Sequence, residues 1–161
     1  MTDVNLNLEN FKTDLSPFIN QGQSGLLPAL LYVQEEYGFI SEDFISEIAN
    51  FFNLSKAEVF GVKSFYHDLH DEKPGKHMIK ICRAEACLAN GAKSIEAAAI
   101  KALGTKFDTT SKDGSATLKS VYCLGTCAHG PSVMVNGQIH LRVTEDKLKS
   151  LISNFEKVSG T

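Results

Sequence analysis

Four cysteines arranged as two pairs, Cys82 with Cys87 and Cys123 with Cys127, constrain the fold of this 161-residue chain more than any other feature. Four residues separate the first pair, three separate the second, and 35 lie between the pairs. Residues 77–81 read as a strand that runs directly into Cys82, and residues 118–122 alternate as a second strand that ends before Cys123. Because strand ends fix the loops that follow them, two loops at one edge of a sheet can bring the four sulfurs together. The spacing therefore predicts an α/β fold with a cysteine site at a sheet edge.

Four thiolates at such an edge suit more than one chemistry. Paired cysteines in a reducing compartment are more often metal ligands or redox groups than disulfides. Iron–sulfur clusters and structural zinc both accept four thiolates, although zinc knuckles are usually tighter. Neither pair is the Cys-x-x-Cys of a thioredoxin-type enzyme, and unconnected buried cysteines are a further alternative. His129 is able in principle to replace one ligand, but four thiols already complete a set, so we interpret it as a loop or interface residue.

Composition excludes several classes of function. Hydrophobic residues make up 43% of the chain and charged residues 22%, which is typical of a globular protein. The net charge is −3 and no run of Lys or Arg is present, so we expect no nucleic-acid binding. No apolar run approaches the roughly 20 residues that span a bilayer, and residues 1–5 lack a signal-peptide pattern. We therefore expect a cytoplasmic protein that is not inserted in a membrane.

The first part of the chain predicts a small helical unit over residues 1–70. A helix is expected from Gly25 to a stop at Gly38. Ser41 is a candidate N-cap for a second helix, and Ser55 with Glu58 forms a capping-box pattern for a third. Three aromatic residues late in this unit are expected in its core or at an interface: Phe60, Phe65 and Tyr66.

After a polar linker at residues 68–76, the pattern changes to that of a mixed domain over residues 77–158. The strand at residues 77–81 is followed by an Ala-rich helix at about residues 90–103 and a possible strand at residues 105–109. Asn136-Gly137 between alternating apolar runs predicts a two-residue hairpin, and Thr144 caps a final helix. The order strand, helix, strands, hairpin, helix is that of a thioredoxin-like α/β domain.

The residues around the cysteines suit an anionic group. Cys87 is expected just before the helix at residues 90–103, where free N–H groups stabilise negative charge. Gly125 and Gly130 would let the backbone approach closely. Arg83 and Glu85 lie inside the first cysteine loop and are expected to face solvent or a partner. Four small or apolar residues are expected to limit water access: Ala84, Ala86, Leu124 and Ala128.

These residues resemble the thioredoxin-like [2Fe–2S] subunits of the respiratory complex I 24 kDa family. The resemblance rests on Cys82-x4-Cys87 with Cys123-Leu-Gly-Thr-Cys127, and on the Gly130-Pro131 that follows. It extends over about residues 20–155 through further motifs: Leu26-Leu27-Pro28-Ala29-Leu30, Tyr37-Gly38-Phe39-Ile40, Val59-Phe60-Gly61-Val62 and Ser64-Phe65-Tyr66. Within the family, the first cysteine loop looks most like that of the gamma subunit of cytoplasmic NAD-dependent formate dehydrogenases, because Ala86 stands where complex I subunits usually carry proline.

The resemblance implies one [2Fe–2S] cluster held by Cys82, Cys87, Cys123 and Cys127, and a role in one-electron transfer without catalytic residues on this chain. It implies a flavin- and NAD-binding partner subunit and a larger iron–sulfur catalytic subunit, with FMN, NAD and the molybdenum cofactor only on those partners. The equivalent subunit of complex I or of an NAD-linked hydrogenase is the first alternative. A zinc-stabilised interaction module is the alternative from a different class.

Overall fold

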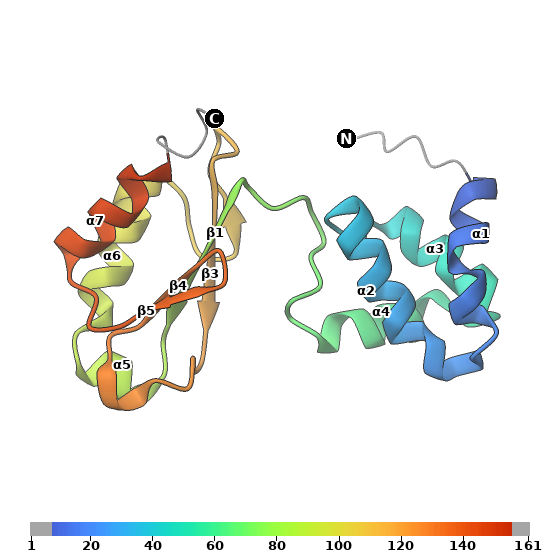
Figure 1. Ribbon diagram of the computed structural model, residues 1–161, viewed down its shortest axis with the longest axis horizontal. Coiled ribbons are helices and arrows are strands. Elements are labelled where there is room, and N and C mark those ends of the chain that lie inside the picture. The colour runs from blue at the N-terminus through green and yellow to red at the C-terminus, as the bar shows by residue number, and fades with distance from the viewer. Residues whose placement is uncertain (1–7, 156–161) are drawn as a thin grey trace. The chain divides into compact units, whose positions relative to one another are not determined.

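The computed structural model describes residues 8–155, so the expectations for residues 1–7 and 156–158 lie outside the described part. The chain separates into two compact units, with the division between Lys73 and Pro74. Residues 66–76 form neither helix nor strand (Figure 1). Among the helices of residues 8–155, none has the length and apolar composition that crossing a bilayer requires.

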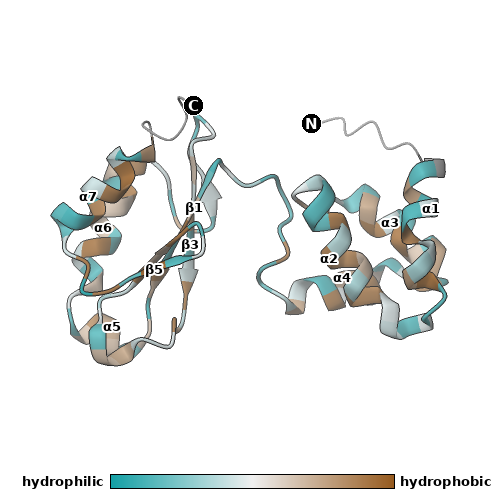
Figure 2. Ribbon diagram, in the orientation of Figure 1, coloured by the Kyte–Doolittle hydropathy of each residue, from teal (hydrophilic) through white to brown (hydrophobic). Residues whose placement is uncertain are grey.

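The described residues of the first unit, 8–73, form helices and no strand. It contains α1 (Leu8–Ile19), a short 3-10 turn (Gly22–Gly25), α2 (Leu26–Tyr37), α3 (Glu42–Phe52) and α4 (Lys56–Phe65). These helices enclose one apolar core, and their brown and teal faces are visible in Figure 2. The largest fully buried side chains of this core are Phe11, Leu15, Leu30, Val33, Ile40, Phe44 and Ile48.

Local sequence signals explain where these helices begin and end. Gly38 adopts a left-handed conformation at φ 84° and ends α2. The Ser41 side chain accepts a hydrogen bond from the Phe44 N–H at the start of α3. At the start of α4, the Ser55 hydroxyl accepts from the Glu58 N–H while the Glu58 carboxylate accepts from the Ser55 N–H. The capping-box prediction is confirmed.

The second unit is a mixed sheet covered by two helices. Over residues 74–155 of this unit, five strands lie in the order β2-β3-β1-β4-β5. Their bounds are β1 His77–Cys82, β2 Thr109–Thr110, β3 Ala116–Val121, β4 Val133–Val135 and β5 Gln138–His140. β1 and β3 are parallel, and the other neighbours are antiparallel. The helices α6 (Ala92–Leu103) and α7 (Glu145–Ser153) lie side by side and share an apolar core with the sheet (Figure 1). This is the thioredoxin-like arrangement that the sequence predicts.

Several details of this unit match the sequence signals. Asn136 at φ 49° and Gly137 at φ 84° form the hairpin turn between β4 and β5. The Thr144 hydroxyl accepts a hydrogen bond from the Lys147 N–H and caps α7. Gly104 ends α6 in a left-handed conformation. These signals are local, so the sequence alone was sufficient to find them.

Three predictions about the second unit are wrong in detail. Cys87 is not in a loop at the start of α6 (residues 92–103); it lies inside a separate short helix that comes before it, α5 (Glu85–Ala89). The possible strand at residues 105–109 is reduced to the two-residue β2, because residues 105–108 form a turn instead. β3 begins at Ala116, two residues earlier than expected, because residues before Leu118 also pair with β1.

Candidate metal centre

The first cysteine pair is buried at the end of β1. Cys82 is the last residue of that strand, and its N–H donates to the Ser132 carbonyl at 3.1 Å. Cys87 follows on α5, and the two side chains are only 2% and 1% exposed. Burial is the main cause that raises the pKa of the Cys87 thiol, and the neighbouring Cys82 thiol raises it further. This pair is therefore positioned by packing.

The second pair is held by an exposed loop that follows β3. Cys123 lies two residues after the strand, and Cys127 begins a short 3-10 turn (Cys127–His129). Their Sγ atoms are 3.6 Å apart. The Gly125 N–H donates to the Cys123 Sγ at 3.3 Å, and Gly125 has a φ of 76°, which favours glycine. The hydrogen bond and charge of Cys123 raise the pKa of the Cys127 thiol.

The two cysteine loops meet at Gly130. A side-chain carbon at Gly130 would lie 3.2 Å from the Cys87 Sγ and 3.3 Å from the Cys87 Cα, so only glycine fits without displacing Cys87. The turn that begins at Cys127 contacts α5. The charge of Cys82 also contributes to the raised pKa of Cys127, which links the two pairs electrostatically. The structure therefore brings all four predicted cysteines to one end of the β1–β3 pair.

The donor set fits a two-iron cluster. All four thiols are free, and in residues 8–155 no three His, Cys, Asp or Glu side chains gather around one point as ligands of a single ion. The sulfurs are instead held as pairs, and a two-iron cluster takes four thiolates, two on each iron. A tetrahedral metal with bonds to sulfur of about 2.3 Å places two thiolates about 3.7 Å apart. The 3.6 Å between Cys123 and Cys127 matches that spacing.

Apolar residues shield the buried pair. Cys82 and Cys87 pack with the fully buried Ala92 and with partly buried neighbours: Ala84, Leu88, Val121 and Leu124. Ala84 and Leu124 thus lie where the sequence predicts a barrier to water, whereas Ala128 is exposed. His129 is exposed as well, and its carbonyl accepts from the Arg142 N–H.

Arg83 is 38% exposed, and it also makes contacts within its own unit that the sequence does not predict. The Arg83 Nε donates to the Glu96 Oε1 at 3.0 Å, and its guanidinium lies 5.1 Å from the centre of the Phe107 ring. Its backbone N–H donates to the Val121 carbonyl at 2.7 Å. Arg83 therefore joins the end of β1 to α6. Glu96 is distant in sequence, and no local pattern marks it as the partner.

Two hydroxyl residues near the cysteines were not identified from the sequence. Ser132 is fully buried, and its Oγ accepts a hydrogen bond from the Thr126 Oγ1 at 2.8 Å. Ser132 also lowers the pKa of the Cys87 thiol, against the effect of burial, which raises it. Thr126 lies between the two cysteines of the second pair, so its position in the sequence indicates that it is close to the site. No sequence feature indicates the same for Ser132.

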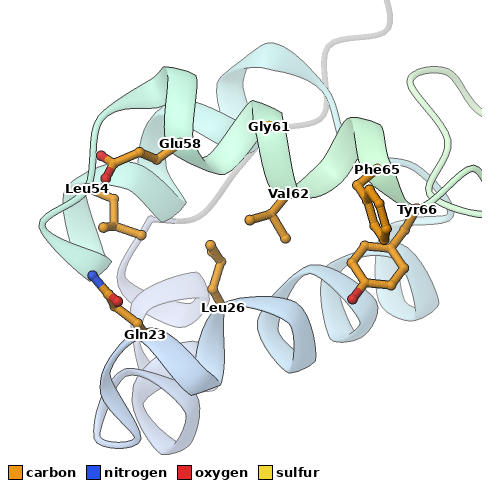
Figure 3. Close-up of a pocket in the computed structure, with 8 residues that line it drawn as sticks. All are labelled: Gln23, Leu26, Leu54, Glu58, Gly61, Val62, Phe65 and Tyr66. Carbon is orange, nitrogen blue, oxygen red and sulfur yellow. The ribbon is translucent and has the colours of Figure 1, made fainter.

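The helical unit carries an apolar groove between α2 and α4. The groove has a volume of about 630 Å³, and its floor includes Leu26 and Val62 (Figure 3). Glu58 lies toward one end and Phe65 with Tyr66 toward the other (Figure 3). Phe65 is 73% exposed, Phe60 is 53% exposed and Tyr66 is 41% exposed. Of the two alternatives for these aromatic residues, core and interface, the exposure favours an interface.

Residues 14–156 match the family model of the thioredoxin-like [2Fe–2S] ferredoxins. The chain is 32% identical over 130 residues to a subunit of the NADH-quinone oxidoreductase of Escherichia coli K12, covering 81% of this chain and 78% of that protein. It is 31% identical over 134 residues to the corresponding protein of Buchnera aphidicola, with 83% and 78% covered.

A crystal structure of an NAD⁺-reducing [NiFe]-hydrogenase in the H₂-reduced state has a similar fold, with a TM-score of 0.68 and 19% identity. The similarity covers 83% of this chain but only 22% of the hydrogenase chain, so this chain spans about a fifth of that protein's length.

Proposed function

Because this chain belongs to the thioredoxin-like [2Fe–2S] ferredoxin family and carries one [2Fe–2S] cluster, we propose that it is a one-electron carrier whose cluster is held by four cysteines. Cys82 and Cys87 are the proposed ligands of one iron, and Cys123 and Cys127 those of the other. The observation that carries this proposal is the arrangement of four free thiols as two pairs at one end of the parallel strands β1 and β3.

The surroundings of the cysteines suit a group that gains negative charge. When bound, the cluster accepts and releases a single electron, and four thiolates, two ferric ions and two sulfides already carry a net charge of minus two. The Gly125 N–H stabilises charge on the Cys123 sulfur, and Ser132 lowers the pKa of the Cys87 thiol. The packing of Ala92 and Leu88 excludes water from the Cys87 side. No residue on this chain is needed to bind a hydride donor or an organic substrate.

The carrier is proposed to work as a cytoplasmic subunit of a larger NAD-dependent oxidoreductase. Its first proposed partner is a flavin- and NAD-binding subunit, and its second is a larger iron–sulfur catalytic subunit. The first cysteine loop favours the gamma subunit of a formate dehydrogenase, with FMN, NAD and the molybdenum cofactor on the partners. A complex like that of the NADH-quinone oxidoreductase relatives, or an NAD-linked hydrogenase, is the alternative.

The groove between α2 and α4 is the proposed docking surface for the flavin-binding subunit. Residues 1–73 contain four lysines and twelve acidic residues, a net charge of −8, whereas residues 74–161 carry +5. A partner segment that fits this groove is therefore cationic as well as apolar. Its apolar side chains would cover Phe65 and Tyr66, and a Lys or Arg would meet Glu58, which stays ionised because its hydrogen bonds to Ser55 lower its pKa.

Anaerobic purification of the chain from its native host tests both parts of this proposal. We expect a red-brown protein with iron and acid-labile sulfide in equal amounts, an electron paramagnetic resonance signal after reduction, and a co-purifying flavoprotein. A colourless protein with one zinc and no sulfide would establish the interaction-module alternative instead. Phe65→Ala should release the flavoprotein without loss of iron, and Ser64→Ala, which alters the neighbouring exposed residue, is its control.

A further inference from the structure

The Thr126 hydroxyl connects the exposed cysteine loop to the segment beside the buried cysteine pair. The Thr126 Oγ1 donates a hydrogen bond to the Ser132 Oγ at 2.8 Å. The Ser132 carbonyl in turn accepts from the Cys82 N–H at 3.1 Å, and Ser132 is fully buried. Because Thr126 lies between Cys123 and Cys127, one side-chain and one backbone hydrogen bond connect the two cysteine pairs.

The same hydroxyl is diverted from the role that a threonine at this position usually has. Thr126 is the N-cap residue of the 3-10 turn at residues 127–129, where a threonine side chain commonly accepts from a backbone N–H of its own turn. Among the described residues, its side chain bonds Ser132 and caps no N–H of the turn. The turn is closed by backbone instead, because the His129 N–H donates to the Thr126 carbonyl at 2.9 Å.

The hydrogen bond closes a loop of five residues, 127–131, around the contact between the two pairs. Cys127 begins this loop, and Gly130 within it lies so close to Cys87 that a side-chain carbon there would be 3.2 Å from the Cys87 Sγ. The loop also contacts α5, the helix that carries Cys87. By fixing both ends of the loop, the hydrogen bond restrains Cys127 relative to the buried pair.

We propose that Thr126 is a positioning residue whose hydrogen bond to Ser132 holds the exposed cysteine pair at cluster-binding distance from the buried pair and so slows the loss of the cluster. The inference rests on the proposed assignment of the four cysteines as ligands. A two-iron cluster needs four thiolates in fixed positions, and a loop that is already ordered loses less conformational entropy on binding. The exposed pair depends most on this restraint, because core packing restrains it less than the buried pair.

Thr126→Val removes the hydroxyl and keeps the shape of the side chain. The buried Ser132 hydroxyl then loses its donor, and we expect the anaerobically purified protein to release iron to excess EDTA about fivefold faster than the wild type. Thr126→Ser keeps the hydroxyl, so it should release iron at nearly the wild-type rate. The decay of the visible absorption of the cluster gives the rates, and this rescue separates the hydrogen bond from the packing of the threonine.

Ser132→Ala removes the acceptor of the same hydrogen bond. We expect a smaller acceleration of iron release, about threefold, because Thr126 is only half-buried and its hydroxyl is able to bond water instead. The double variant, Thr126→Val with Ser132→Ala, should release iron no faster than Thr126→Val alone, because both changes remove one shared interaction.

A matched control breaks a similar hydrogen bond far from the cysteines. The Thr110 and Thr117 hydroxyl oxygens are 2.7 Å apart and join β2 to β3. Thr117 lies near the start of β3, whereas Cys123 follows the end of that strand. Thr110→Val should therefore leave the rate of iron release unchanged, and urea unfolding measures what each variant costs in global stability.

The proposal is overturned if Thr126→Val releases iron as slowly as the wild type, or if Thr126→Ser releases it as fast as Thr126→Val. An equal acceleration in Thr110→Val would overturn it as well, because release would then follow global stability. If Thr126→Val does not fold, Ser132→Ala decides alone, and an unchanged rate there rejects the proposal. These outcomes leave the carrier function intact as long as the wild type contains iron and sulfide. A wild type without a cluster would reject the carrier function itself.

Discussion

The two cysteine pairs of this protein are positioned in different ways. Cys82 and Cys87 are buried, and the end of β1, the helix α5 and Gly130 surround them. Cys123 and Cys127 are exposed and held by loop backbone, including the Gly125 N–H. One half of the proposed cluster site is thus part of the hydrophobic core, and the other half lies at the surface.

Because of this difference, we expect the two pairs to contribute differently to cluster binding and to electron transfer. A buried pair has fixed geometry, but burial opposes negative charge, which is why the pKa of Cys87 is raised. An exposed pair is less fixed, but water and backbone N–H groups stabilise charge there, and a partner protein is able to approach it. We expect the buried pair to control cluster retention and the exposed pair to be the side at which electrons enter and leave.

The largest effect is expected from removing one buried ligand. Cys87→Ala should reduce iron and sulfide content to less than about a tenth of wild type, because no water or other ligand has access to replace the thiolate. Cys123→Ala should retain a larger, labile fraction, because a solvent oxygen is able to take the open position. Iron and sulfide analysis after anaerobic purification measures the cluster content of both variants. Equal cluster content in the two variants would show that the buried pair does not control cluster retention more than the exposed pair does.

The second effect is a difference in thiol reactivity in the protein without its cluster. Iodoacetamide should modify Cys123 and Cys127 at least about tenfold faster than Cys82 and Cys87, because reactivity follows solvent access. Mass spectrometry of peptides from a time course gives the four rates. Similar rates at all four positions would show that the buried pair opens to solvent without the cluster.

The third effect compares two glycines, one beside each pair. Gly130→Ala places a carbon against the Cys87 Sγ and should destabilise the protein by about 1–3 kcal/mol while lowering cluster content. Gly125→Ala meets no neighbouring atom, and its cost of about 1–2 kcal/mol comes from the positive φ. Urea unfolding measures the stability changes. If Gly125→Ala lowered the cluster content as much as Gly130→Ala, the close contact at Cys87 would not be the cause.

The smallest effect on the site is expected from Asp113, near the start of β3 and at the opposite end of that strand from Cys123. Hydrogen bonds from Ser111 and Ser115 lower the pKa of Asp113 from 3.8 to about 2. Its contribution to stability is therefore present above about pH 4 and is lost as the pH falls toward 2. The difference in urea midpoint between wild type and Asp113→Asn should shrink over that range. At neutral pH the variant should keep its full iron content, and a loss of iron would show that the site is sensitive to the far end of the sheet.

Local signals predicted much of the fold. The capping box at Ser55, the stop at Gly38, the hairpin at Asn136-Gly137 and the cap at Thr144 each depend on residues close in sequence. α5 was missed because five residues are too few to show a helical period. The cysteines were identified as candidate ligands by their type, spacing and position after strands.

Long-range contacts of the site were beyond the sequence. Arg83 pairs with Glu96 on α6, and the Cys82 N–H donates to the carbonyl of Ser132, which lies in a distant segment. A buried serine and an exposed serine look the same in a sequence, because burial depends on what packs against them. The position of Ser132 beside the buried cysteines therefore follows only from the pairing of β4 with β1.

Anomalous diffraction at the iron edge, from crystals of the protein grown without oxygen, tests the central assignment most directly. The assignment predicts two iron peaks, one bonded to Cys82 and Cys87 and the other to Cys123 and Cys127. A single peak, or an iron bonded to any other side chain such as His129, would contradict it.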